Sequence, residues 1–147
     1  MISFTIKTSG TLSKQIEAKT EKALRLATYS VWFLMRKRIF NDGLKASGAP
    51  IGTYSADYLK IRQTKYNRTS DAKKILVLTD SLRLNFVWDA INKTSYAIGV
   101  NGSQSYGGKK VTNIDKVKWN DPTNEIFIVS IAESKAAKEA FVKEMNI

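Results

Sequence analysis

The spacing of hydrophobic positions changes several times along the chain, and each change predicts a new element. Residues 3–7 alternate apolar and polar side chains, which is typical of a short strand. Residues 12–40 then carry apolar side chains at helical spacing with no Pro or Gly among them, which predicts one helix of about eight turns. We expect this helix to end at Asn41-Asp42-Gly43, because Gly43 can adopt the left-handed conformation of a helix C-terminus.

The end of this predicted helix is apolar nearly all round, over residues 31–35. A helix end of this kind is usually buried on more than one side. Two interpretations remain open, namely burial in the protein's own core and contact with another subunit. The candidate interface residues on this helix are Val31, Trp32, Phe33 and Met35.

The central part of the chain has a weaker pattern. Residues 44–54 are punctuated by Gly and Pro and predict a loop, after which Ser55 can cap a short helix over residues 56–62 or beyond. Residues 63–74 have no apolar periodicity and predict a mobile, solvated loop. Residues 75–78 form a short apolar block, for which periodicity leaves a buried strand and a helical turn equally open.

Strand signals return in the next part of the chain. Residues 82–88 alternate apolar and polar side chains, which predicts a strand with one buried face. Residues 95–100 predict its antiparallel partner in a hairpin. Gly, Ser and Asn dominate residues 101–110, which we therefore expect to form a flexible loop.

The C-terminal part predicts a strand and a closing helix. Residues 111–122 suggest one helical turn that an Asp-Pro sequence ends, and residues 125–129 predict a strand. Ser130 and Glu133 have the spacing of a capping box, which predicts the start of a helix over residues 131–145.

These elements indicate an α+β fold. We expect the long N-terminal helix to pack on a small antiparallel sheet of three or four strands, with a long central loop and a C-terminal helix. No internal repeat or biased linker divides the chain, so residues 1–147 predict a single domain. The sequence has no apolar run that approaches the roughly 18 residues of a membrane span, and its N-terminus lacks the pattern of a signal peptide. We therefore expect a protein made and used inside a cell, or built into a particle assembled there.

Composition excludes several kinds of catalytic and metal site. The chain has no Cys and no His, which rules out zinc fingers, thiol nucleophiles and Ser-His-Asp triads. Asp80 beside Ser81 is the nearest approach to a reactive pair, but no base stands at a recognisable spacing, which favours a turn or cap role. We expect no cofactor and no metal.

Charge points to an anionic neighbour. The chain carries a net charge of +11, and residues 36–74 alone hold ten Lys and Arg against three Asp, a local charge of +7. Such an excess implies nucleic acid or an acidic protein partner. In the same segment Tyr54, Tyr58 and Tyr66 alternate with basic residues, a pattern that can stack bases and bind phosphates or dock on a neighbouring subunit. Composition alone favours neither interpretation.

Several short motifs follow one another along nearly the whole chain. They are Gly52-Thr53-Tyr54-Ser55, Tyr58 with Arg62, Leu78-Thr79-Asp80-Ser81-Leu82-Arg83, Tyr96-Ala97-Ile98-Gly99 and Ile126-Phe127-Ile128-Val129-Ser130. In this order the motifs resemble those of the tail-completion, or head–tail joining (neck), proteins of tailed bacteriophages. The chain departs from that family in lacking a histidine in the loop after the hairpin.

The resemblance implies a structural virion protein without catalysis. It implies a ring of six or twelve copies in the head–tail connector, assembled in the host cytoplasm, with contacts to adjacent portal or adaptor and tail proteins and to genome DNA in the channel. The residues we assign to subunit or partner contacts are Val31, Trp32, Phe33, Met35, Tyr54, Tyr58, Arg62 and Tyr66. The basic residues we assign to the DNA are Lys60, Lys65, Arg68, Lys73 and Lys74.

Residues 52–74 are then a docking arm, which we expect to be irregular in the free monomer and ordered in the assembly. One alternative is a stand-alone basic nucleic-acid-binding protein, and another is a small ribonuclease.

Overall fold

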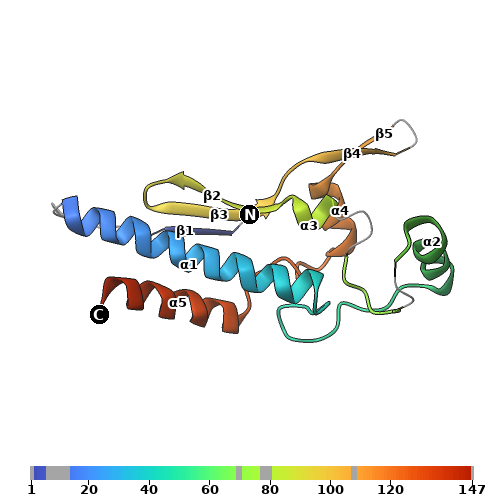
Figure 1. Ribbon diagram of the computed structural model, residues 1–147, viewed down its shortest axis with the longest axis horizontal. Helices are drawn as coiled ribbons and strands as arrows, with labels where there is room; N and C mark the ends of the chain where they lie inside the picture. Colours follow the sequence, from blue (N-terminus) through green and yellow to red (C-terminus); the bar gives the residue numbers. More distant parts are fainter. Residues whose placement is uncertain (1, 6–13, 69–70, 77–80, 107–108, 147) are drawn as a thin grey trace. The chain divides into compact units, whose positions relative to one another are not determined.

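The computed structural model describes residues 2–5, 14–68, 71–76, 81–106 and 109–146 (Figure 1). The chain forms two compact units. Unit 1 consists of Met1–Met35, Val87–Gly99 and Val129–Ile147, and unit 2 consists of Arg36–Phe86 and Val100–Ile128. The single domain expected over residues 1–147 stays a prediction.

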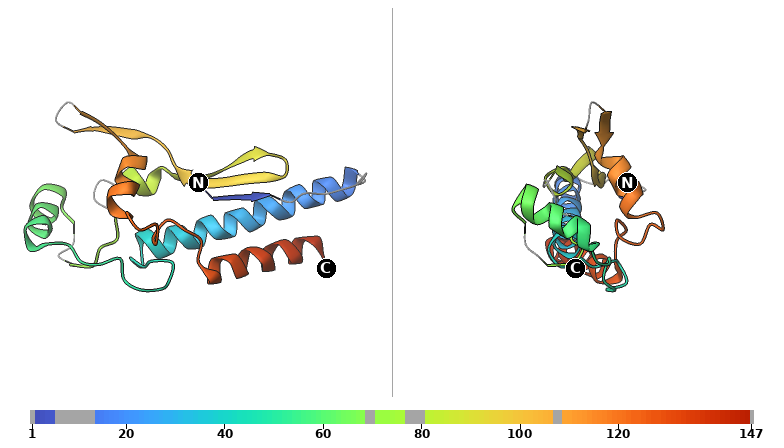
Figure 2. Two further views of the ribbon diagram at one scale, coloured as in Figure 1. Left: turned by 180° about the vertical axis from the view of Figure 1, so that it is seen from behind. Right: turned by 90° about the vertical axis from the view of Figure 1, so that its right-hand side faces the viewer.

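Unit 1 has the expected α+β architecture. The long helix α1 (Lys14–Phe40) confirms the predicted helix, whose residues 12 and 13 lie outside the described residues. The sheet runs along one side of α1 and the C-terminal helix α5 (Ile131–Met145) along another (Figures 1 and 2). Ala23 and Val31 of α1 have no exposed surface, so burial of this apolar face holds the unit together.

The sheet of unit 1 has three strands in the order β1-β3-β2. They are β1 (Ile2–Thr5), β2 (Phe86–Asn92) and β3 (Ser95–Val100). β1 pairs with β3 in antiparallel register, from Ile2 opposite Ile98 to Thr5 opposite Ser95. The predicted N-terminal strand is therefore confirmed over residues 3–5, while residues 6 and 7 lie outside the described residues, and the predicted pairing of residues 95–100 with the strand before them is confirmed.

The start of α5 confirms the predicted capping box. Ser130 Oγ accepts a hydrogen bond from the Glu133 amide at 3.2 Å, and the Glu133 carboxylate accepts one from the Ser130 amide at 2.7 Å. Two amides that the helix cannot satisfy are thus satisfied locally. Near the other end of α5, the Glu144 carboxylate lies 2.7 Å from the Lys22 ammonium of α1.

Unit 2 contains short elements. They are α2 (Ala56–Tyr66), α3 (Ser81–Leu84), α4 (Asn113–Asn120) and a second, two-stranded sheet of β4 (Ser103–Tyr106) and β5 (Lys109–Thr112). Its buried apolar side chains are Ile39, Phe40, Leu82, Phe86 and Ile126. The Phe40 ring lies 5.7 Å from the Phe86 ring and 6.3 Å from the ring of the half-buried Phe127, measured between centroids.

The strand predicted over residues 82–88 is wrong in its first half. Leu82 lies in α3, and the strand begins only at Phe86. Leu82 is buried whereas Leu84 is 65% exposed, so the two leucines do not share one face as the alternation implied. Leu and Arg are also better helix formers than strand formers.

The flexible loop predicted over residues 101–110 is wrong for residues 103–106, 109 and 110, which lie in β4 and β5, with Ser103 opposite Thr112; residues 107 and 108 lie outside the described residues. Polar residues can form a ladder because the backbone supplies its hydrogen bonds. A signal for the hairpin was present, since Gly107-Gly108 is a dipeptide typical of hairpin turns. α4 then extends the single predicted turn, capped by Thr112.

The strand predicted over residues 125–129 is absent, because side chains bind its backbone on both sides. The buried Asp121 carboxylate accepts hydrogen bonds from the amides of residues 125, 126 and 127, at 2.7, 3.0 and 2.8 Å. The Arg38 guanidinium donates to the carbonyls of Ile126 and Ile128, at 3.1 and 2.8 Å. Donors and acceptors that a neighbouring strand would have bound are therefore already satisfied.

Candidate functional site

Residues 52–74, which we call the arm, are closed at their base by backbone pairing. Lys74 donates its amide proton to the Gly52 carbonyl at 2.9 Å, and Tyr54 donates to the Ala72 carbonyl at 2.8 Å. Thr53 and Lys73 form an antiparallel bridge. The arm is therefore a closed loop that carries α2 between its paired ends (Figure 1).

Gly43 fixes the base of the arm to the end of α1. Its φ of +61° is the left-handed conformation expected for the helix end, and its carbonyl accepts a hydrogen bond from the Ile51 amide at 2.8 Å. A Cβ at this position would lie 2.7 Å from the Lys74 carbonyl oxygen. Both the backbone conformation and this close approach require glycine.

Within the arm, α2 confirms the helix predicted over residues 56–62 or beyond. Ser55 caps it as predicted, by accepting a hydrogen bond from the Tyr58 amide at 3.3 Å. The helix continues to Tyr66, and Asn67 ends it in the left-handed conformation with its amide bonded to the Arg62 carbonyl. The expectation of an irregular arm is therefore wrong for α2 and for the paired base, because local capping and backbone pairing satisfy the chain there.

Arg62 organises the interior of the arm. Its guanidinium lies 4.4 Å from the centroid of the Tyr54 ring, and the Tyr54 and Tyr58 rings are 5.1 Å apart. Arg62 is only 2% exposed. We had assigned these three residues to a partner interface, but Arg62 is buried in the arm itself, where a cation over an aromatic ring is stabilising.

The basic residues assigned to DNA divide into two groups. Lys60, Lys65 and Lys73 are exposed, whereas Arg68 and Lys74 are half-buried. Lys74 lies at the paired base of the arm, where partial burial lowers the pKa of its amine. Of the remaining assigned tyrosines, Tyr66 is half-buried, with the Lys65 ammonium 5.8 Å from its ring centroid.

The interface residues assigned to α1 also divide. Val31 and Met35 have no exposed surface and belong to the protein's own core, so they are not available to a partner in this conformation. Trp32 is half-buried and Phe33 is 52% exposed. Val31 and Met35 therefore confirm burial in the core for their side of the helix end, whereas contact of Trp32 and Phe33 with another subunit stays a prediction.

Of the Asp80-Ser81 pair, Ser81 is buried and hydrogen-bonded, whereas Asp80 lies outside the described residues. The buried Ser81 hydroxyl donates to the Asn113 side-chain oxygen at 3.2 Å and accepts from the Lys116 ammonium at 3.4 Å. These contacts join α3 to α4. Within the described part of the chain, no cluster of three or more acidic side chains is placed to hold a metal ion.

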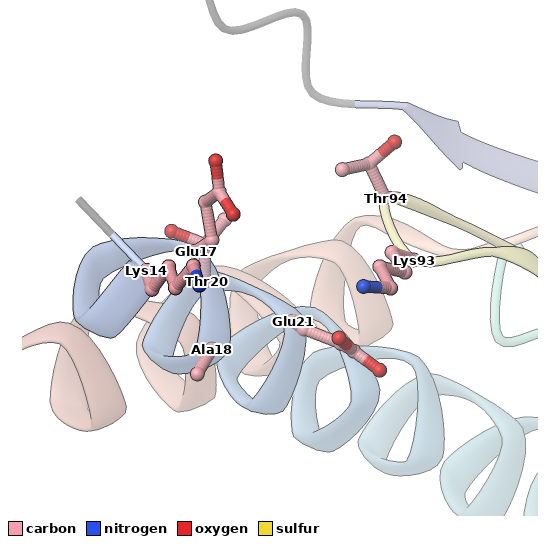
Figure 3. Close-up of a pocket in the computed structure, with 7 residues that line it drawn as sticks. All are labelled: Lys14, Glu17, Ala18, Thr20, Glu21, Lys93 and Thr94. Carbon is pink, nitrogen blue, oxygen red and sulfur yellow. The ribbon is translucent and has the colours of Figure 1, made fainter. Parts of the chain in front are cut away.

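Unit 1 contains a hollow of about 520 Å³ between the start of α1 and the turn from β2 to β3 (Figure 3). Lys14, Glu17 and Glu21 line it from the helix, and Lys93 lines it from the turn. The side chains of Lys14, Glu17 and Lys93 are exposed, so charged groups in contact with solvent line part of the hollow.

No family model matches the chain, and the comparisons with curated proteins and with solved structures likewise found no match. Among the described residues, no helix has the length and apolar character needed to cross a membrane.

Proposed function

We infer that this protein is a structural virion protein of a tailed bacteriophage, which forms a ring in the head–tail connector between the portal and the tail. The proposal rests first on the ordered series of motifs that resembles the neck proteins. The structural observation that carries it is the arm, a closed loop whose base is paired at Thr53 and Lys73 and whose helix α2 carries exposed lysines. Such an element suits contact with a neighbouring protein.

A closed ring needs two different surfaces on each copy, because its subunits meet head to tail. The arm supplies one surface of basic character. The exposed side of α1 around Phe33 supplies another, of aromatic character. In this proposal the protein performs no catalysis, and its net charge of +11 attracts acidic neighbouring proteins and the DNA in the channel.

The test is incorporation of an arm variant into particles. Tyr54→Ala and Tyr58→Ala are less suitable for this purpose, because the two half-buried rings pack against each other and the Tyr54 ring packs against Arg62, so these changes would also remove contacts within the arm. The double variant Lys60→Glu/Lys65→Glu changes only exposed side chains of α2, and Lys135→Glu/Lys138→Glu on α5 is a control with the same charge change.

We expect both double variants to keep the wild-type circular dichroism spectrum. A phage or prophage that lacks its own copy of the gene is then supplied with each variant. The arm variant should yield infectious particles at about a hundredth of the control level or less, corresponding to about 2.7 kcal/mol of lost contact energy. Equal yields from the two variants would remove the arm from the proposal, and absence of the wild-type protein from purified virions would remove the proposal itself.

The second candidate is a stand-alone nucleic-acid-binding protein, favoured by the exposed Lys60, Lys65 and Lys73 of the arm. Three phosphate contacts would make the logarithm of the binding constant fall with the logarithm of the salt concentration with a slope of about −2.7. Fluorescence anisotropy of a labelled DNA duplex measures this slope. Undetectable binding at low salt would exclude this candidate.

A further inference from the structure

Strand β2 forms an open edge of the sheet of unit 1. It pairs with β3 on one side, and among the described residues no strand pairs with it on the other side (Figure 1). Just before β2, the Asn85 carbonyl accepts the Asn101 amide at 3.0 Å, so this position faces the strand that continues β3. Alternation along the strand then turns the backbone groups of Trp88 and Ala90 toward the open edge. The Ala90 amide agrees with this, since it donates to the carboxylate of its neighbour Asp89 at 2.8 Å.

The sequence of β2 lacks residues that protect a free edge from pairing. Strands at the edge of a sheet are usually protected by Lys, by Pro or by an element that covers them. β2 reads Phe-Val-Trp-Asp-Ala-Ile-Asn, without Lys or Pro and with Asp89 as its single charge. Its last four residues are all exposed, and Ile91 is 57% exposed. The open edge of β2 therefore suits pairing with a further strand, in which backbone hydrogen bonds supply the affinity.

The β4–β5 hairpin of unit 2 offers such a strand. Its sheet has two described strands, so each of them has an unpaired edge, and a sheet of this size gains stability from a further strand. Among the described strands, β5 is the one that contains lysine, at positions 109 and 110. Lys110 is exposed, as is Asp89 of β2. The ion pairs formed by the described residues involve neither Lys110 nor Asp89, so both charges are available to a partner.

We propose that β5 of a second copy of this chain pairs with the open edge of β2, with Lys110 of that copy beside Asp89. Opposite charges on neighbouring strands stabilise their pairing. Because β2 and β5 are different surfaces, the contact is head to tail, as a closed ring requires. The inference deepens the connector function and rests on it for the choice of a second copy as the partner.

A symmetric pairing of β2 with β2 of a second copy fits less well. Antiparallel pairing over all seven residues would place the central residue, Asp89, opposite its own counterpart. Like charges directly opposite each other destabilise a sheet. Such a contact would also use one surface twice, which closes a pair of copies and leaves no surface for a ring. Nucleic acid fits less well too, because the charge on β2 is a carboxylate.

The first experiment follows association of the purified full-length protein by sedimentation velocity. The wild type should associate as its concentration rises. Asp89→Lys and Lys110→Asp each place like charges side by side, and each should weaken association about tenfold. A one-to-one mixture of the two variants restores opposite charges wherever the variants alternate, so it should recover the association of the wild type. The matched controls are Glu139→Lys and Lys138→Asp, at exposed positions of α5, which should associate as the wild type does.

Engineered cysteines locate the contact, because the chain has no Cys of its own. Asp89→Cys and Lys110→Cys are prepared as two separate proteins, mixed and oxidised, and the products are weighed by mass spectrometry. We expect a disulfide between the two different proteins, since opposite residues of paired strands lie within the reach of a disulfide. A mixture of Asp89→Cys with Lys138→Cys is the control, in which we expect no such product.

Several results would overturn the proposal. Equal association of the single variants and the wild type, or no recovery in their mixture, would remove the pairing of Asp89 with Lys110. Preferential crosslinking of Asp89→Cys with itself would assign the edge to a symmetric contact. A wild type that stays monomeric, with no crosslink in either mixture, would assign the edge to a strand of a different protein.

The purified protein also separates this proposal from the connector function. Absence of the protein from virions would remove the connector function, and recovery of association in the variant mixture would still show the contact between copies. Conversely, a protein that is present in virions and whose Asp89→Lys variant associates normally would keep the connector function and lose the strand pairing.

Discussion

The two units of this protein are held together by different kinds of interaction. In unit 1, a long helix packs against a sheet and a second helix, and the buried residues such as Val31 and Met35 are apolar. Unit 2 also has a small apolar core, which includes Phe40 and Phe86, but its connecting segments are held by polar side chains bonded to the backbone, above all by Arg38 and Asp121.

This difference has a physical consequence. Hydrophobic burial is roughly proportional to area and has no direction, so it tolerates a change of shape that keeps the volume. A hydrogen bond to a backbone group needs a particular atom in a particular place, and a buried group that loses its partner is costly. Unit 2, which carries the arm, should therefore be the more sensitive to conservative substitutions.

The largest effect should come from Asp121→Ala. This change removes the acceptor of three backbone hydrogen bonds, from residues 125, 126 and 127. We expect a loss of about 3 kcal/mol or more in the free energy of unfolding, because hydrogen bonds to a charged group contribute about 1.5 to 3 kcal/mol each. Urea denaturation followed by circular dichroism measures it. Asp121→Asn keeps one acceptor oxygen and should lose less, and a loss below about 1 kcal/mol in the Ala variant would contradict the role given to Asp121.

The next test compares one conservative substitution in each unit. Arg38→Lys loses the planar fork that reaches the carbonyls of Ile126 and Ile128 and should cost about 2 kcal/mol. Met35→Leu keeps the volume of a fully buried side chain and should cost less than about 1.5 kcal/mol. Thermal and urea unfolding of both variants measure the two losses in the free energy of unfolding. The reverse order of the two costs would break the contrast between the units.

The capping boxes allow the same motif to be tested in both units. Ser130 caps α5 in unit 1, and Thr112 caps α4 in unit 2. We expect Ser130→Ala and Thr112→Ala each to cost about 1 kcal/mol. Hydrogen exchange followed by mass spectrometry should show faster exchange in α5 for the first variant and in α4 for the second. Faster exchange in both helices for either variant would mean that the two units open together.

The smallest effects should come from pH. In unit 2 the hydrogen bond from the Thr112 hydroxyl lowers the pKa of Asp115. The pKa of Glu125 is lowered mainly by the hydrogen bond from the Lys45 ammonium. A carboxylate with a lowered pKa in the folded state stabilises the fold above its ordinary pKa, and this contribution is lost as the pH falls through the folded value. Acid should therefore weaken unit 2 first.

At alkaline pH, unit 1 should lose stability before unit 2. Burial raises the pKa of Tyr96 in unit 1, the Glu21 carboxylate raises it further, and the Arg25 guanidinium partly opposes both. This contribution to stability is present below the ordinary pKa of tyrosine and is lost as the pH rises through the folded value. The half-buried Lys74 amine of unit 2 has a lowered pKa, so its desolvation cost is relieved as the pH rises. Limited proteolysis mapped by mass spectrometry should show unit 2 cut first in acid and unit 1 first in base; a single order at both extremes would contradict this.

Much of unit 1 can be predicted from the sequence, because its determinants are local. Helical spacing predicts α1, the capping box predicts the start of α5 at Ser130, and alternation of apolar and polar residues predicts β1. The exposed Leu26 and Tyr29 were not recognised, although their spacing to Phe33 is readable on the outer face of the helix.

Unit 2 was predicted less well, because its determinants lie far apart in the sequence. Arg38 bonds the carbonyl of Ile126, 88 residues away, so no local pattern reveals that residues 125–129 cannot join a sheet. The assignment of Arg62 to an interface failed because a charged residue suggests a surface position, whereas here the Tyr54 ring compensates for its burial. The exposed Lys60 and Lys65 were placed correctly on the surface, and the DNA contact assigned to them stays a prediction.

The central claim is that this chain is a connector protein whose arm reaches a neighbouring protein. Its most direct test is a cryo-electron microscopy reconstruction of the neck of the particle that contains it. We predict a closed ring of this protein between portal and tail, with α2 of each copy ordered against a neighbouring chain. A neck without this protein, or a ring in which α2 contacts solvent alone, would contradict the account.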